Sequence, residues 1–308
     1  MNEIVDEINK LKKEKNAIIL AHNYQIPDIQ DIADFVGDSL DLSKKAKATD
    51  INLIVFCGVQ FMAETAKILS PQKTVLLPEK DAGCPMAEMI TSKDVRDLRK
   101  KYPDAAIVAY VNTNADVKAE VDVCCTSANA VKVVNSLPER KIVFLPDKNL
   151  GHYVKINTKK EVILWWGYCP VHDPGISLNE VKKMKNEYPE AVLMVHPEAP
   201  PEVVDIADYV LSTNGMVKTA KELDKKEFIV GTEEGLTYRL KKENPDKEFY
   251  RIKTAVCVNM KKTNLTSVLN ALRHEQYKIE LPEDTIIRAK RALDRMLKYS
   301  LLINAFCE

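Results

Sequence analysis

The sequence predicts an α/β protein made of three similar units, each a parallel sheet with helices on both faces, around a pseudo-threefold axis. Two observations predict this fold. Short strand-like segments rich in β-branched residues alternate with charged amphipathic helices along the chain. A pattern of residues also recurs at intervals of about 85 positions. The alternation predicts the class, and the recurrence predicts the number of copies.

Nine segments have the length and composition of buried strands. They are residues 16–21, 51–57, 74–78, 105–111, 141–146, 161–166, 190–195, 227–231 and 248–252. Continuous apolar runs of this kind are typical of parallel strands that are covered on both faces. Because the carboxyl ends of such strands face the ligand crevice, residues that follow a strand are the first candidates for a site.

The repeat is visible in the residues that follow the first strand of each unit. His22, Tyr110 and His196 are separated by 88 and 86 residues. An aspartate stands 12 residues after each, a hydroxyl 17 residues after, and a later strand ends 36 residues after. These positions hold Asp34, Asp122 and Asp208, then Ser39, Ser127 and Thr213, then Gly58, Pro146 and Thr232. We expect the hydroxyls to be helix N-caps and the aspartates to bind backbone groups.

Each unit also ends on a cysteine that follows its last strand. Cys84, Cys169 and Cys257 lie 62, 59 and 61 residues after His22, Tyr110 and His196. Three equivalent loops meeting on a threefold axis would bring three thiolates together. Such a set could hold zinc completed by histidine or water, or a [4Fe–4S] cluster with one iron that lacks a protein ligand. The remaining cysteines are interpreted as packing or terminal residues: Cys57, Cys124, Cys125 and Cys307.

The other residues near these strand ends suit a small, anionic, oxygen-rich substrate. His22, His196 and the hydroxyls at helix starts can bind carboxylates or phosphate. Tyr24, Tyr110 and Glu198 can transfer protons. His172, in the segment CPVH, either reaches the site or satisfies its own loop.

Several of these segments resemble the quinolinate synthase A family of NAD biosynthesis, in order and over nearly the whole chain. They are AHNYQIPDIQDIADFVGDS, AGCPMAEM, AYVNTNAD, CTSANAV, CPVH, VHPEAP and AVCVNMKKTNL. The resemblance implies three α/β domains around a pseudo-threefold axis. It also implies a [4Fe–4S] cluster on that axis, bound by Cys84, Cys169 and Cys257. We expect the domains to comprise residues 1–84 plus 258–308, 85–169 and 170–257.

The resemblance further implies a transferase that condenses iminoaspartate with dihydroxyacetone phosphate to quinolinate, phosphate and two waters. The open iron would be the Lewis acid of the dehydration. Tyr24 would assist the ketose–aldose isomerisation and later proton transfers, and Glu198, beside His196, would be the general base. The substrate-binding residues would be His22, Ser39, Tyr110, Asn112, Ser127, His196, Glu198 and Thr213. An enzyme that oxidises aspartate would be a functional partner.

Two alternatives remain beside this reading: a different hydro-lyase or aldolase on the same three-cysteine scaffold, or a sensor that binds a metal or a phosphosugar. The 45 basic and 45 acidic side chains indicate no nucleic-acid partner. We expect no membrane association and a cytoplasmic location, because the apolar runs are far shorter than the roughly 20 residues of a membrane span. In the segment after Cys257 we expect a helix, a short strand at 277–281 and a helix that begins near Pro282. We expect all three to pack on the first unit.

Overall fold

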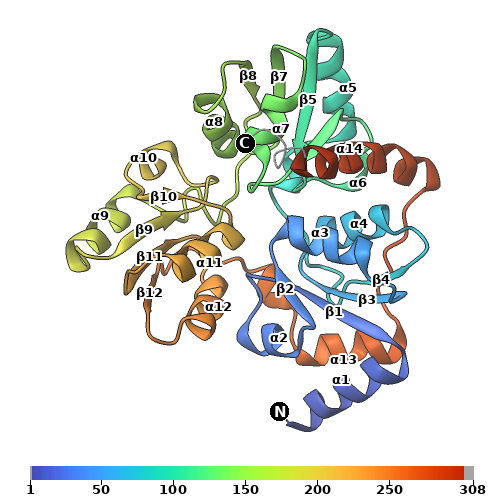
Figure 1. The fold of residues 1–308 in the computed structure, drawn as a ribbon. Helices are drawn as coiled ribbons and strands as arrows, with labels where there is room; N and C mark the ends of the chain where they lie inside the picture. Colours follow the sequence, from blue (N-terminus) through green and yellow to red (C-terminus); the bar gives the residue numbers. More distant parts are fainter. Residues whose placement is uncertain (1, 302–308) are drawn as a thin grey trace.

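The computed structural model describes residues 2–301 and contains three four-stranded sheets, each with flanking helices. Figure 1 shows the three units around a common centre, the first in blue, the second in teal and green, and the third in yellow and orange. Neighbouring strands within each sheet run parallel. The predicted fold class is confirmed.

The first unit alternates four helices with four strands. Its helices are α1 (Asn2–Glu14), α2 (Pro27–Ile32), α3 (Ser39–Ala48) and α4 (Gln60–Leu69). Its strands are β1 (Ala17–His22), β2 (Phe35–Gly37), β3 (Leu53–Cys57) and β4 (Thr74–Leu76).

The second unit has the same alternation after a short 3₁₀ turn, η1 (Ala87–Met89). Its helices are α5 (Ser92–Lys101), α6 (Ala115–Lys118), α7 (Ala130–Ser136) and α8 (Lys148–Ile156). Its strands are β5 (Ala105–Tyr110), β6 (Val123–Cys125), β7 (Lys141–Leu145) and β8 (Glu161–Leu164).

The third unit repeats the pattern and is followed by a second 3₁₀ turn and two helices. Its helices are α9 (Leu178–Glu187), α10 (Pro201–Val204), α11 (Thr213–Glu222) and α12 (Gly235–Glu243). Its strands are β9 (Val192–Val195), β10 (Tyr209–Val210), β11 (Glu227–Gly231) and β12 (Glu248–Arg251). The elements that follow are η2 (Met260–Lys262), α13 (Leu265–His274) and α14 (Glu283–Leu301).

The strand order is the same in the three sheets: β2-β1-β3-β4, β6-β5-β7-β8 and β10-β9-β11-β12. Alternate side chains of the central strands face opposite apolar layers, as the pleat of a strand requires. In the first sheet, Leu20 and Phe56 face α3 and α4, whereas Ile19 and Val55 face α1 and α13. Identical topology in three consecutive segments confirms that the chain is a threefold repeat.

The repeated aspartates bind the first strand of their own unit. Each carboxylate accepts a strand N–H at 2.7–2.8 Å, and each aspartate N–H donates to the carbonyl of the same strand residue. The pairs are Asp34 with Ile19, Asp122 with Ile107 and Asp208 with Leu193. A cation from the preceding helix pairs with each carboxylate: Lys12, Arg99 and Lys185. The predicted structural role of the aspartates is confirmed.

A repeated lysine, which the sequence analysis missed, caps a helix in each unit. Lys73, Lys160 and Lys247 are spaced by 87 residues. Their ammonium groups donate to carbonyls at the C-terminal ends of α3, α7 and α11. A cation at this end of a helix is favourable because the last carbonyls lack partners within the helix.

The predicted N-cap role of the three hydroxyls is wrong. The N-caps of α3 and α11 are Asp38 and Ser212, so Ser39 and Thr213 are the first helical residues. The N-cap of α7 is Asn129, two residues after Ser127. Compared with a helix capped by the hydroxyl, α3 and α11 begin one residue earlier and α7 begins two residues later.

The nine predicted strands are present, but the prediction for 277–281 is wrong. This segment forms a single antiparallel bridge, between Lys278 and Leu76. Tyr277 has a φ of 56°, and this left-handed backbone interrupts an extended strand. Three short edge strands were missed: β2, β6 and β10.

The two C-terminal helices pack on different units. In Figure 1, α13 lies beside α1 of the first unit, whereas α14, in dark red, lies between α4 and the second unit. Apolar residues of α14, including Ala289, Leu293 and Met296, belong to the core of the second sheet. The expectation that both helices pack on the first unit is therefore corrected for α14. None of the helices among residues 2–301 is long and apolar enough to cross a bilayer.

Replacing Asp122 with alanine is expected to lower the free energy of unfolding by about 1–3 kcal/mol, because the N–H of Ile107 loses its acceptor. Thermal unfolding followed by circular dichroism measures the effect. The control is Asp97→Ala, which removes an exposed pair with Lys93 and should cost less than about 0.5 kcal/mol. Equal losses in the two variants would contradict the structural role of Asp122.

Candidate active site

A cavity of about 180 Å³ is lined by residues of all three units and brings the predicted site residues together. The predicted residues in its wall are His22, Tyr24, Ser39, Cys84, Tyr110, Asn112, Ser127, Cys169, His196, Glu198, Thr213 and Cys257. No predicted site residue lies elsewhere in the part of the chain that the structure describes. Distant segments meet here because each unit directs the carboxyl ends of its strands toward the same space.

Equivalent positions of the three units carry different side chains in the cavity. His22 and Tyr110 end β1 and β5, and His196 directly follows β9. Two residues further on, at the next shared position, the units carry Tyr24, Asn112 and Glu198. The repeat thus supplies one scaffold position three times and a different functional group at each copy.

The two repeated histidines are neutral hydrogen-bond donors toward the cavity. Nδ1 of His22 accepts the N–H of Tyr24 at 3.2 Å, and Nδ1 of His196 accepts the N–H of Glu198 at 3.4 Å. In a neutral imidazole this leaves the proton on Nε2. Burial is the main reason that the pKa of both imidazoles falls from 6.5 to about 3. Nε2 of His196 lies 3.1 Å from the hydroxyl of Ser127.

A chain of three hydrogen bonds and one ion-pair contact links two tyrosines across the three units. The hydroxyl of Tyr24 lies 2.6 Å from that of Thr232, which lies 2.9 Å from Nε2 of His172. Nδ1 of His172 lies 2.9 Å from Oε2 of Glu198, and the hydroxyl of Tyr110 donates to Oε1 of Glu198 at 2.6 Å. Carboxylate, imidazole and hydroxyl follow one another in the order of a hydrolase triad, with Tyr24 beyond the hydroxyl.

The charge states of this chain follow from its surroundings. Burial and the charge of Glu198 raise the pKa of Tyr24 and Tyr110 well above their usual value, so both are phenols. Burial opposes the ionisation of Glu198. The nearby imidazoles of His172 and His196 and the hydrogen bond from Tyr110 outweigh this and lower the pKa of Glu198 below its usual range. The chain therefore joins an ionised base to two protonated phenols.

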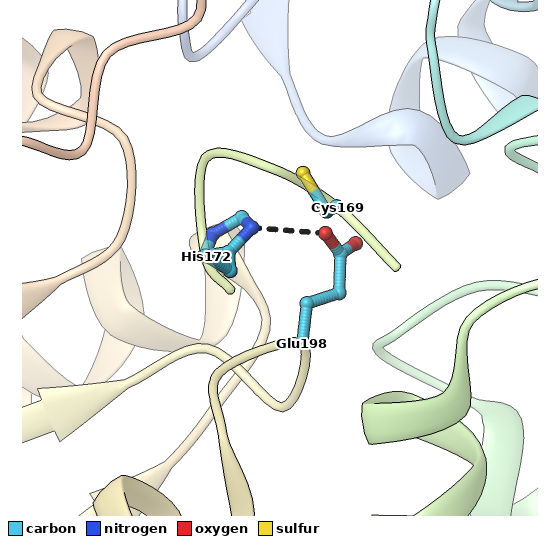
Figure 2. Close-up of side chains that lie close together, drawn as sticks. All are labelled: Cys169, His172 and Glu198. Atoms are coloured by element: carbon cyan, nitrogen blue, oxygen red, sulfur yellow. Dashed lines mark ion pairs between the residues drawn. The ribbon is translucent and has the colours of Figure 1, made fainter. Parts of the chain in front are cut away.

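His172 and Thr232 belong to the site, although the sequence analysis left His172 open and assigned no role to Thr232. Figure 2 shows His172 and Glu198 facing each other, with the sulfur of Cys169 close by. The repeat position of Thr232, shared with Gly58 and Pro146, could have identified it as a site residue. Like His196, Thr232 directly follows a strand. His172 has no histidine at the matching positions of the other units, so the repeat could not reveal it.

Three free thiols lie half-buried in the cavity wall: Cys84, Cys169 and Cys257. Burial raises the pKa of each. Backbone N–H groups two and three residues further on donate to the sulfurs of Cys84 and Cys257, and these bonds favour the thiolate. The other described cysteines are buried and do not line the cavity: Cys57, Cys124 and Cys125. Cys307 lies outside the described residues.

One group of described side chains could hold a single metal ion: the ligand atoms of Cys169, His172 and Glu198 lie within 4.8 Å of one another. Three thiolates are soft ligands that suit either a zinc ion or an iron–sulfur cluster.

The wall of the cavity offers no lysine or arginine from the described residues that could bind an anion. Val59, Phe61 and Met62 of the first unit form an apolar section of the wall. The polar section contains neutral donors together with the carboxyl groups of Asp38 and Glu198, and Ser39 and Thr213 lie in the first turn of α3 and α11. Helix N-termini present unpaired N–H groups that favour anions.

Comparison of the whole chain with known proteins identifies its family. The family described as "Quinolinate synthetase A protein" matches residues 6–298. A quinolinate synthase of Thermodesulfovibrio yellowstonii is 55% identical over 299 residues, covering 96% of this chain and 98% of that protein. One from Caldicellulosiruptor saccharolyticus is 55% identical over 97% of this chain and 99% of its own length. One from Aquifex aeolicus is 52% identical over 97% of this chain and 95% of its own length. With three thiols and a hydrogen-bonded acid–base chain in one cavity, and a match along nearly its full length, the chain belongs to the quinolinate synthetase A family.

Proposed function

We propose that the chain is a quinolinate synthase that condenses iminoaspartate with dihydroxyacetone phosphate to quinolinate, phosphate and two waters. The observation that carries the proposal is the single cavity that joins three free thiols to the chain from Tyr24 to Tyr110. Family membership and the names of the relatives support the same activity.

Cys84, Cys169 and Cys257 would hold a [4Fe–4S] cluster in which one iron has no protein ligand. When bound, such a cluster supplies a Lewis acid that assists the loss of a hydroxyl group. The protein's part is to present three half-buried thiols and to exclude competing ligands. The apolar wall at Val59, Phe61 and Met62 lowers the polarity around the reacting groups.

The substrate carboxylates and the phosphate would be bound by neutral donors. These are the Nε2–H groups of His22 and His196 and the hydroxyls of Ser39, Ser127 and Thr213. The buried Oδ1 of Asn112 has no partner within the protein and can accept an N–H or O–H of the substrate. Charge-neutral recognition suits an enzyme that must release a dicarboxylate product, because a buried ion pair with arginine would bind substrate and product alike.

Proton transfer would use the two ends of the hydrogen-bond chain. Glu198, held ionised, would take protons from the substrate, and Tyr24 would donate to or accept from the substrate oxygen that changes during isomerisation and dehydration. Thr232 can donate or accept between Tyr24 and Nε2 of His172, and Nδ1 of His172 lies 2.9 Å from Glu198. A proton gained at Glu198 would be returned at Tyr24 along this path once Nδ1 of His172 forms a hydrogen bond with the carboxylate.

Wild-type protein purified without oxygen should be brown, hold about four irons and form quinolinate and phosphate from the two substrates. The Cys169→Ser variant should lose the iron and at least about 100-fold in activity, because one sulfur ligand is missing. Iron analysis and ultraviolet detection of quinolinate measure both effects. Cys125→Ala, which alters a thiol outside the cavity, is the control. A colourless zinc protein, or ligand binding without turnover, would favour the alternative functions.

Glu198→Gln should reduce kcat by about 10²–10⁴, since an amide cannot take up a proton and removes the carboxylate that faces His172. Its iron content should equal that of the wild type. Glu202→Gln, a substitution at an exposed site on α10, should leave kcat unchanged. Full turnover by the Glu198→Gln enzyme with its cluster intact would remove the base assignment.

Stability should fall as the pH is lowered below about 6.5. The pKa of His22 is about 3 in the folded protein and near 6.5 when unfolded, so the unfolded chain binds more protons in this interval. The His22→Asn variant keeps an acceptor for the N–H of Tyr24 but cannot titrate. Between about pH 7 and about pH 4 its melting temperature should fall less than that of the wild type. Parallel curves for the two proteins would contradict a neutral, buried His22.

A further inference from the structure

A buried ion pair lies behind the cavity wall and has no place in the chain from Tyr24 to Tyr110. Glu233 directly follows Thr232, and its side chain is 0% exposed. Nζ of Lys261, in η2, lies 2.9 Å from its Oε1. Neither residue lines the cavity. A charge pair removed from water this completely needs further hydrogen bonds to be tolerated, so its other contacts are informative.

Those contacts lead to two parts of the site. Oε1 of Glu233 accepts the N–H of Cys257 at 3.0 Å, and Oε2 accepts the N–H of Gly235 at 2.7 Å. Nζ of Lys261 donates to the carbonyl of Tyr24 at 2.9 Å. One ion pair thus contacts the loop that carries a thiol of the third unit and the turn that carries Tyr24 of the first unit.

The second unit has a comparable arrangement at the same repeat position. Asp147 lies 37 residues after Tyr110, as Glu233 lies 37 residues after His196. Asp147 is fully buried, its Oδ1 accepts the N–H groups of Asn149 at 2.9 Å and Leu150 at 2.7 Å, and its backbone forms a β-bridge with Gly167, two residues before Cys169. The first unit has Val59 there, so its cysteine loop lacks this carboxylate. A carboxylate at this repeat position therefore belongs to the second and third units only, and the fold of a unit does not require it.

We propose that Glu233 and Lys261 are positioning residues that hold the Cys257 loop and the Tyr24 turn in one fixed relation. The inference rests on the proposed function and deepens it. Cys257 presents its sulfur to the metal site while Tyr24 presents its phenol to the substrate, and both act on the same reacting molecule. A displacement of one relative to the other would reduce the rate without weakening substrate binding.

A carboxylate is needed because two backbone N–H groups and an ammonium group converge on it. In Glu233→Gln only one amide oxygen can accept, so either Cys257 or Gly235 faces an NH₂ group. Lys261→Met removes the contact with Tyr24 and keeps the length of the side chain. The matched control is Glu234→Gln at the neighbouring residue, which removes a partly exposed side-chain pair with Arg251 and keeps the backbone hydrogen bond from Glu234 to Ala255.

The first measurement is hydrogen exchange of the Cys257 and Gly235 amides in protein without metal. At least one of the two should exchange about 10- to 100-fold faster in Glu233→Gln, and both should be unchanged in Glu234→Gln, because a hydrogen bond to a charged acceptor is lost. In loaded protein, iron should be removed by a chelator at least about tenfold faster from Glu233→Gln. Unchanged exchange of both amides would overturn the proposal.

The second measurement separates positioning from a general loss of stability. Glu233→Gln and Lys261→Met should each lower kcat with KM unchanged. The double variant should resemble the single ones, because the pair acts as a unit. Additive losses, or a normal kcat in both single variants, would overturn the link to Tyr24. If Glu233→Gln does not fold, Lys261→Met, whose altered side chain is 19% exposed, carries the kinetic test. Amide exchange in metal-free protein does not depend on the reaction. A wild type that makes no quinolinate would therefore refute the proposed function and leave this test standing.

Discussion

Parallel strand pairing is the constraint on which the cavity depends. In a parallel sheet every strand ends at the same edge, so a unit that folds correctly exposes its functional residues on one side. Here β1, β5 and β9 end beside the same cavity, and α3 and α11 begin there. The aspartate that bonds the first strand of each unit keeps that strand in register, and a slip of one residue would turn His22 or His196 away from the cavity.

The three copies have kept their backbone and diverged in chemistry. Two residues after His22, Tyr110 and His196, the units carry a phenol, an amide and a carboxylate, in Tyr24, Asn112 and Glu198. Two residues after the ends of β3, β7 and β11 they carry Val59, Asp147 and Glu233. A symmetric scaffold therefore surrounds an asymmetric site. An asymmetric substrate needs this, because it must meet a base on one side and a proton donor on another.

The units are held together in unequal ways. The first and second units share an apolar core that includes α14. The apolar layers of the third unit contain only its own residues among those described. Its contacts with the other two are largely polar, as in the bonds from Arg239 to Asn23 and from Tyr110 to Glu198. The hydrogen-bond chain crosses these boundaries, so its geometry reports on the assembly of all three units.

The fold class, the number of repeated units and the predicted residues that line the cavity could all be inferred from the amino-acid sequence. Strand composition and fixed offsets are local properties, and they indicate which residues follow a strand even without coordinates. The sequence could not reveal β10, because a strand of two residues depends on its neighbouring strand. It could not reveal the N-caps at Asp38 and Ser212 either, because a cap depends on exact backbone angles. The sequence analysis expected α14 on the first unit, whereas its apolar residues belong to the core of the second sheet. An amphipathic helix fits any complementary apolar surface, so its sequence does not identify its partner.

How the cavity residues are connected depends on the packing of the three units. Tyr24 of the first unit reaches Thr232, and Tyr110 of the second unit reaches Glu198, because both units meet the third at this point. The tautomers of His22 and His196 likewise depend on which nitrogen accepts a backbone N–H. Offsets along a chain identify residues that can converge. Distances of about 3 Å between their polar atoms are set by the packing of whole units, which no single segment encodes.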